Sequence, residues 1–338
     1  MLVQVLIILG AAAGIWFFSD MLSKGTDALG KRFRIDPGVR GATLDAVASS
    51  FPEFCTVIIA LFAGAFDAGV GTIAGSALYN ILVIPAVSVL VGGPLAIQKQ
   101  VVRRDGFLYV AVVAALIAVI WLGPEVVVGT KTSHAISPWA GAVAIVVYLG
   151  YVVVLVMQAR KSAGEKRAAE AEAKREEGDN EDKDKPFAPW KTAGFVLVGI
   201  MGIGVATHFL VHASLGLFKI IGLSEAIAGV TVLAAATSLP DTLLSVFAVR
   251  RGDADGAVSN AFGSNSFDIL ICLGLPILVT GGVLVDWQGS WPMLAFLFAS
   301  TIVSVLFLLT DWRLTRREAA VMGATYLLFM GLAFGGVF

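Results

Sequence analysis

The sequence predicts an all-α membrane protein in which ten transmembrane helices form two inverted repeats of five. Its composition is the first indication, because 57% of the 338 residues are hydrophobic and only 14% are charged. A water-soluble domain does not need that much apolar surface. The second indication is a series of apolar stretches long enough to cross a bilayer. The third is a segment that occurs twice in the chain, 188 residues apart, each time with a carboxylate inside an apolar run.

Each predicted span is an apolar stretch that can cover a hydrocarbon core of roughly 30 Å as a helix. The N-terminal MLVQVLIILG lacks a basic region and a clear cleavage site, so we expect a retained first helix rather than a signal peptide. The ten stretches are residues 2–20, 37–65, 69–95, 106–123, 138–158, 191–216, 221–249, 256–283, 290–310 and 319–337.

A charged segment divides the chain in the middle. Between Arg160 and Lys185 the sequence has many acidic and basic residues and almost no large apolar ones, which is typical of a solvated, partly helical linker. We therefore expect a first half at residues 1–158, a loop at 159–190 and a second half at 191–338. Because each half has an odd number of spans, the two halves must cross the membrane in opposite directions.

The basic residues predict the orientation in the cell membrane. With the N-terminus outside, 22 of the 24 Lys and Arg residues fall on the cytoplasmic side, and only Lys131 and Lys219 fall outside. This asymmetry favours an external N-terminus and a cytoplasmic central loop. The oligomeric state stays open.

The duplicated segments carry the polar residues. Residues 41–82 contain GATLDAVASSFPEF and GSALYNIL, and residues 229–270 contain GVTVLAAATSLPDT and GSNSFDIL. An acid in hydrocarbon is costly and marks function by default, so two matched sets indicate one central site built from both halves. The offset pairs Glu53 with Asp241, Asn80 with Asp268, Ser76 with Ser264, Ser49 with Thr237 and Ser50 with Ser238.

Each repeat contains a proline that interrupts its helix. Pro52 and Pro240 have no N–H, so the carbonyls of Ala48 and Ala236 lose their helical partners. In a membrane such a carbonyl must be satisfied by a hydroxyl, a water or a bound cation. Hydroxyl residues stand beside both breaks, so each break gathers oxygen ligands next to a carboxylate.

The ligand set predicts a site for hard cations. Carboxylate, hydroxyl, amide and carbonyl oxygens suit Ca²⁺, and they also suit Na⁺ or K⁺, whereas Zn²⁺ and Cu²⁺ prefer nitrogen or sulfur. No Lys or Arg lies near Glu53, Asp241 and Asp268 in sequence, so these acids must bind cations or hold protons. Competition between Ca²⁺ and other cations for one site is the physical basis of exchange.

Other functions find little support. Cys55 and Cys272 fall in apolar runs and read as small buried residues, and no Cys/His cluster indicates a resident cofactor. The net charge of −1 gives no sign of nucleic-acid binding. Asp45, whose repeat position is Leu233, either lines a cytoplasmic vestibule or lies near the interface, with the second slightly favoured.

At SSFPE…GSALYN and TSLPD…GSNSFD the chain resembles the cation/calcium exchanger superfamily, and SNAFGSNSFDILICLGLP is most similar to its potassium-dependent sodium/calcium exchangers. The resemblance implies Ca²⁺ coordination by Glu53 and Asp241. It places Asn80 and Asp268 at mid-site and links Asp268 to K⁺. It implies Na⁺ coordination by the hydroxyls of Ser49, Ser50, Ser76, Thr237, Ser238 and Ser264, with the carbonyls of Ala46 and Ala234.

The leading hypothesis is therefore a secondary antiporter that exchanges Ca²⁺ for Na⁺ by alternating access, with K⁺ co-transport left open. Its alternative is Ca²⁺/H⁺ exchange by the same fold. An intramembrane aspartyl protease would need a close acid dyad sharing a proton, and here the acids stand beside hydroxyl-rich breaks. A passive channel is the third alternative, which only saturable, coupled flux separates from exchange.

Overall fold

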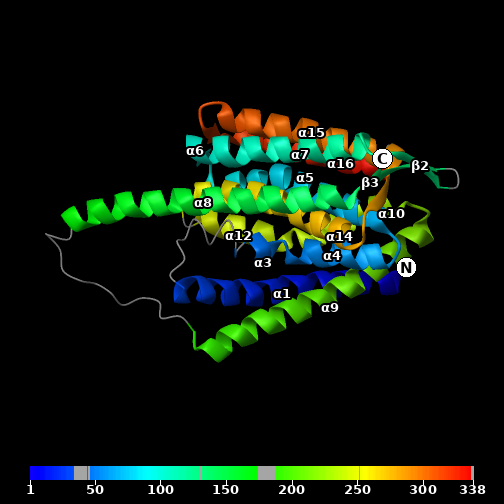
Figure 1. The fold of residues 1–338 in the computed structure, drawn as a ribbon, viewed down its shortest axis with the longest axis horizontal. Helices are drawn as coiled ribbons and strands as arrows, with labels where there is room; N and C mark the ends of the chain where they lie inside the picture. The colour runs from blue at the N-terminus through cyan, green and yellow to red at the C-terminus, as the bar shows by residue number, and fades with distance from the viewer. Residues whose placement is uncertain (34–43, 45, 129–130, 174–186, 251, 336–338) are drawn as a thin grey trace.

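The computed structural model describes residues 1–33, 44, 46–128, 131–173, 187–250 and 252–335. The described chain is mostly helical, with its helices running roughly along one common axis (Figure 1). Six helices are continuous over 19 residues or more. They are α1 (Leu2–Arg32), α5 (Phe66–Gly92), α8 (Pro138–Ala173), α9 (Pro189–Ile221), α15 (Trp287–Leu309) and α16 (Arg316–Phe334).

The other helical segments are interrupted by short breaks or by π-helical turns. A π-helical turn widens the backbone hydrogen-bond ladder locally and is frequent at functional sites. These segments are α3 (Ala46–Ser49) with α4 (Phe51–Phe62), α6 (Lys99–Val101) with η2 (Val102–Gly106) and α7 (Phe107–Trp121), α10 (Glu225–Ala228) with η3 (Gly229–Leu233), α11 (Ala234–Thr237) and α12 (Leu239–Arg250), and α13 (Ala254–Phe267) with η4 (Asp268–Leu273) and α14 (Gly274–Val279).

Seven helical segments of the described chain are long and apolar enough to cross a membrane. The bent pair Gly229–Thr237 and Leu239–Arg250, with an angle of 48°, makes an eighth. Two predicted spans fail this test. The predicted span 37–65 is described only as one turn followed by the 12-residue α4, and α16 opens with Arg316, Arg317 and Glu318.

Two small antiparallel sheets depart from the predicted all-α fold. β1 (Leu95–Ala96) pairs with β5 (Arg313–Leu314), and β2 (Glu125–Val128), β3 (Lys131–Ile136) and β4 (Val283–Asp286) form the other sheet. In the chain, one helical passage, α6–η2–α7, lies between β1 and β2. The two sheets therefore lie at opposite ends of the helix bundle. Both chain ends lie at the end that carries β2 and β3 (Figure 1).

The helix α8 continues well past the predicted end of its span at residue 158. It reaches Ala173, as expected for the partly helical start of the charged segment. Figure 1 shows this extension projecting beyond the helix bundle, on the side away from β2. The predicted division into 1–158, 159–190 and 191–338 remains a prediction.

The two helices with the polar motifs lie in the middle of the bundle. In an 18-residue apolar stretch of α5, 72% is buried inside the structure. The corresponding share is 78% in the segment 254–279 and only 17% in α1. The helices α1 and α9 pack on each other at the periphery of the bundle. Their approach is so close that a Cβ atom added to Gly199 would collide with Leu22. The repeated motifs therefore belong to the most enclosed part of the fold.

The boundaries of the helices repeat with the same offset of 188 as the sequence motifs. The matched boundaries are Ala46 and Ala234, Phe51 and Leu239, Phe62 and Arg250, Phe66 and Ala254, Lys99 and Trp287, and Trp121 and Leu309. The breaks match in conformation as well, since Ser50 has φ −89° and ψ 4° and Ser238 has φ −79° and ψ 0°. The two halves therefore share one local plan.

Candidate cation-binding site

The ten polar residues singled out in the sequence all lie buried in the structure, with at most 1% of each exposed. They come from four helical segments that meet in the centre of the bundle. Ser49, Ser50 and Glu53 come from α3–α4, Ser76 and Asn80 from α5, Thr237, Ser238 and Asp241 from α11–α12, and Ser264 and Asp268 from α13–η4.

A carboxylate–serine hydrogen bond occurs once in each half. Ser76 donates to Glu53 Oε1 at 3.1 Å, and Ser264 donates to Asp241 Oδ1 at 2.8 Å. These four residues are matched by the offset of 188. Each bond joins the broken helix of one half to the central helix of the same half, and it fixes one oxygen of the acid.

Hydrogen bonds also connect the two halves. The hydroxyl oxygens of Ser76 and Ser238 lie 2.8 Å apart, and those of Ser49 and Ser264 lie 3.4 Å apart. Asn80 donates to Asp241 Oδ2 at 3.1 Å. The residues from both repeats therefore form one continuous polar cluster rather than two separate sites.

The hydroxyls next to the breaks point their protons backward along their own helices. Ser49 donates to the carbonyl of Ala46 at 3.2 Å, and Thr237 donates to the carbonyl of Ala234 at 3.3 Å. These two bonds are also equivalent under the repeat. Because the proton of each hydroxyl is used locally, its oxygen lone pairs remain available for a cation.

Asp268 belongs to the same cluster but has fewer partners. Its Oδ1 receives a weak hydrogen bond from the thiol of Cys272 at 3.6 Å, and that thiol also lies 3.9 Å from the carbonyl oxygen of Ser50. Asp268 interacts electrostatically with both Glu53 and Asp241. The three acids are therefore close enough to repel one another.

The cluster contains more oxygen atoms than donors. Within the described chain, four of its buried oxygens have no hydrogen-bond partner, and these are Glu53 Oε2, Asn80 Oδ1, Asp268 Oδ2 and Ser50 Oγ. No Lys or Arg of the described residues forms an ion pair with any of the three acids. Buried unpaired oxygens and uncompensated carboxylates are both costly, and bound cations satisfy both.

The acids alone do not form a compact metal centre. Over the described ranges, no three His, Cys, Asp or Glu side chains converge closely enough to hold one metal ion. An ion in this cluster must therefore take hydroxyl, amide or carbonyl oxygens together with carboxylates. That mixed oxygen set suits Ca²⁺ and Na⁺ and is poor for Zn²⁺.

Two asparagines of α13 belong to the cluster although the repeat comparison did not select them. Asn265 accepts a hydrogen bond from Asn80 at 3.0 Å and donates to the carbonyl of Ala77 at 3.1 Å. Asn260 donates to Asp241 Oδ1 at 3.4 Å. Both were missed because their repeat positions are Ala77 and Thr72, yet an amide inside an apolar run was a usable signal.

Asp45, which is expected from the sequence to lie in a vestibule or near the interface, lies outside the described residues. Asp105 is buried elsewhere in the bundle and is bonded to Arg104. Cys272 is fully buried in the hydrophobic core, as expected of a small residue, and its thiol also contacts Asp268.

Comparisons with known proteins show which family the chain belongs to. The sequence model of the family described as "Sodium/calcium exchanger protein" matches residues 3–157 and 191–335. Inner membrane protein YrbG of Escherichia coli (strain K12) is 31% identical over 301 residues, which cover 88% of this chain and 85% of YrbG. Human sodium/potassium/calcium exchanger 2 is 35% identical over 138 residues, covering 39% of this chain and 21% of that protein.

A solved structure supports the fold independently. A structure of the sodium-calcium exchanger NCX_Mj superposes with a TM-score of 0.65 over 98% of both chains, at 20% sequence identity. At that identity the likeness concerns the fold alone. Since the family match covers both helical halves on either side of the charged segment, the chain is a multi-pass membrane protein that belongs to the sodium/calcium exchanger protein family.

Proposed function

We propose that this chain is a secondary antiporter that exchanges Ca²⁺ for Na⁺ at the buried cluster between its two halves. The observation that carries the proposal is the set of unpaired carboxylate, amide and hydroxyl oxygens around three acids that have no basic partner among the described residues. Family membership supports cation exchange with Ca²⁺ as cargo, and it does not support an enzyme.

Each ion would use a different part of the cluster. Glu53 and Asp241 would hold Ca²⁺, since each presents a carboxylate oriented by a serine. The hydroxyls would coordinate Na⁺ together with the carbonyls at Ala46 and Ala234. Asn80 and Asp268 would complete the middle of the site. The Na⁺-coordinating hydroxyls would be those of Ser49, Ser50, Ser76, Thr237, Ser238 and Ser264.

We further propose ten membrane crossings in two inverted halves, with the N-terminus outside and the central loop cytoplasmic. Support comes from the sheets: β3 and β4 lie at one end of the bundle and β1 and β5 at the other, so an even number of crossings separates the members of each pair. The helical passages between β3 and β4 are α8, α9, α10–α12 and α13–α14, so the broken segment α10–α12 has to cross for their number to be even. Figure 1 is consistent with this, because α3–α4 and α10–α12 run in opposite directions.

Two forms of coupling compete for the role of Asp268. K⁺ co-transport is supported by the similarity to sodium/potassium/calcium exchanger 2. Proton coupling is supported by the sparse hydrogen bonding of Asp268, because a carboxyl without strong donors can hold a proton in place of an ion. Ca²⁺/H⁺ exchange is therefore the alternative to Na⁺/Ca²⁺ exchange.

Uptake of ⁴⁵Ca²⁺ into proteoliposomes tests these alternatives. Vesicles loaded with Na⁺ and diluted into Na⁺-free buffer should take up Ca²⁺, with saturation in both ions. K⁺ outside and pH are varied independently, each with an ionophore control that clamps the membrane potential. Uptake driven by a proton gradient but not by Na⁺ would establish the alternative, and unsaturable uptake without any counter-ion would indicate a channel.

A protease mechanism finds no geometric support. Each of Glu53 and Asp241 is bonded to its own serine, and no hydrogen bond directly joins two of the cluster's acids within the described ranges. An acid dyad that shares a proton would require such a bond.

A further inference from the structure

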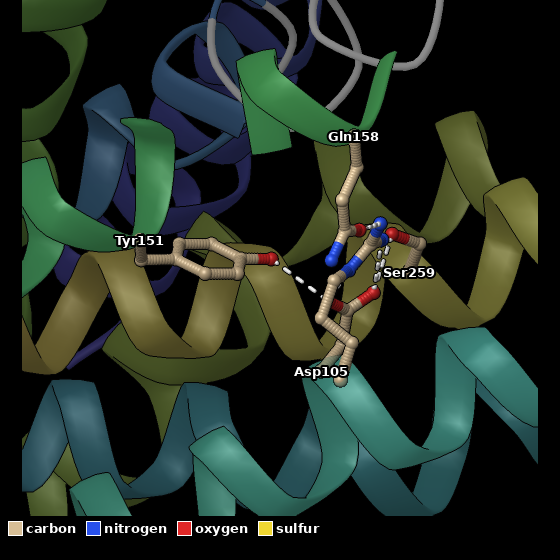
Figure 2. Close-up of polar contacts among 5 residues, drawn as sticks. Asp105, Tyr151, Gln158 and Ser259 are labelled. Atoms are coloured by element: carbon tan, nitrogen blue, oxygen red, sulfur yellow. Dashed lines mark hydrogen bonds and ion pairs between the residues drawn. The ribbon is translucent and has the colours of Figure 1, made fainter. Parts of the chain in front are cut away.

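A second buried carboxylate network lies outside the proposed ion site. Asp105, in the π-helical turn η2, is 1% exposed and accepts four hydrogen bonds. Arg104 donates two of them, from Nε at 2.6 Å and Nη2 at 2.9 Å, in a bidentate pair. Tyr151 donates at 3.0 Å and Ser259 at 2.9 Å (Figure 2).

This network joins three elements that are far apart in sequence. Asp105 lies on η2, Tyr151 lies on α8, and Ser259 lies on α13. Arg104 adds a second bond to α8, donating from Nη1 to Gln158 at 3.0 Å. Figure 2 shows the carboxylate of Asp105 at the point where these side chains converge.

The charge balance of Asp105 is opposite to that of the proposed ion site. Its carboxylate is neutralised by Arg104, and both of its oxygens are used in hydrogen bonds. Glu53 and Asp268 each keep an oxygen without a partner and have no basic neighbour in the described chain. Asp105 is therefore unsuited to recruit a cation, and its geometry is that of an interhelical brace.

One route from the brace to the ion site runs along α13. Ser259 precedes Asn260, whose side chain donates to Asp241 Oδ1 at 3.4 Å. The same helix then presents Ser264, which donates to the same oxygen of Asp241 at 2.8 Å, and it ends next to Asp268. A shift at Ser259 therefore moves two hydrogen-bond donors of Asp241 and the helix end that precedes Asp268.

A second route runs along α8. Tyr151 packs against Tyr148 with ring centroids 6.3 Å apart, and Tyr148 packs edge-on against Phe267 at 5.4 Å. Phe267 is adjacent to Asp268, and Tyr148 interacts electrostatically with Asp268. Asp268 opens the π-helical turn η4, where the helical register changes, so it depends on its neighbours for its position.

We propose that Asp105 is a positioning residue, which holds α13 and α8 in register with the central cluster and thereby sets its affinity for Ca²⁺. The inference rests on the proposed function of that cluster. It assigns Asp105 no contact with the ion. Its effect passes through Ser259 on one side and Tyr151 on the other.

The test measures the Ca²⁺ dissociation constant of the full chain in lipid nanodiscs by equilibrium binding of ⁴⁵Ca²⁺. Asp105→Asn keeps the shape of the side chain but removes the negative charge that pairs with Arg104. Its new amide NH₂ group also has to face one of the groups that donate to Asp105. We expect the constant to rise by about tenfold, which corresponds to about 1.4 kcal/mol. Ser259→Ala, which removes only the α13 contact, should raise it less, and Ser259→Thr should restore it.

Asp253→Ala is the matched control. Asp253 caps the same helix α13 by accepting a hydrogen bond from the Gly256 N–H at 2.7 Å, so its loss weakens the start of α13 without touching α8. The control should lower the melting temperature and leave Ca²⁺ binding unchanged. If Asp105→Asn and Ser259→Ala lower only the melting temperature, Asp105 has a purely structural role and the inference is wrong. If the wild-type chain itself binds no Ca²⁺, the proposed function fails instead.

Discussion

Replacing Asp241 by Asn is the sharpest perturbation of the proposed ion site. Both carboxylate oxygens of Asp241 accept hydrogen bonds, Oδ1 from Ser264 and Asn260, and Oδ2 from Asn80. An Asn side chain has the same shape but only one acceptor oxygen. Its amide nitrogen must face one of these donors, and the cluster loses one of its three negative charges.

The expected loss of affinity follows from the charge of the ion. At an effective dielectric constant of about 20, two unit charges 4 Å apart attract by about 4 kcal/mol, so a divalent ion loses about 8 kcal/mol. If the remaining polar groups screen two thirds of that, about 2.7 kcal/mol is left, or a factor of about 100 in the Ca²⁺ dissociation constant. A monovalent ion loses half as much, or about tenfold.

The Asp241→Asn variant should therefore lose Ca²⁺ affinity more than Na⁺ affinity. Titration calorimetry on detergent-purified protein, with Ca²⁺ and Na⁺ in separate experiments, measures both. The matched control is Asp253→Asn, the same isosteric change at an Asp that caps the start of α13 outside the cluster. Ca²⁺ binding by Asp241→Asn within threefold of wild type, or equal losses for the two ions, would refute the charge argument.

Further predictions use other parts of the same cluster. Asp268→Asn should raise the melting temperature of the ion-free protein, because it removes one of three mutually repelling charges, and should shrink the increase in that temperature on adding Ca²⁺. Gly75→Ala should impair folding or transport, since its Cβ would lie 2.4 Å from the carbonyl oxygen of Val230, whereas Gly263→Ala, with nothing within 4 Å, should be tolerated in the same flux assay. Replacing the exposed His208 and His212 by Ala should leave Ca²⁺-dependent uptake unchanged, because neither belongs to the cluster.

Most polar residues of the central cluster could be predicted from local sequence because each repeat carries its own set of them. A proline break, two hydroxyls and an acid lie within one turn, and a serine and an amide or acid follow on the next helix. These spacings are fixed by the helix itself and need no knowledge of packing. The boundaries of α3–α4 and α11–α12 then repeat with the offset of the motifs.

The contacts between the repeats could not be predicted in the same way. The offset matches Ser76 with Ser264, but it does not say that Ser76 lies against Ser238 and Ser264 against Ser49. It also treats Gly75 and Gly263 as equivalent, although only Gly75 sits against a neighbouring backbone. Approximate symmetry in sequence leaves the fine packing of each half free to differ.

The sequence by itself determined that this protein spans a membrane, is duplicated internally and carries uncompensated acids among hydroxyls, because these are properties of composition and local spacing. Only the tertiary structure decided that Asn260, Asn265 and Cys272 join the cluster, and that Asp105 binds Ser259 across the bundle. Such contacts join residues far apart in the chain, and their geometry depends on how whole helices pack, which no local pattern encodes.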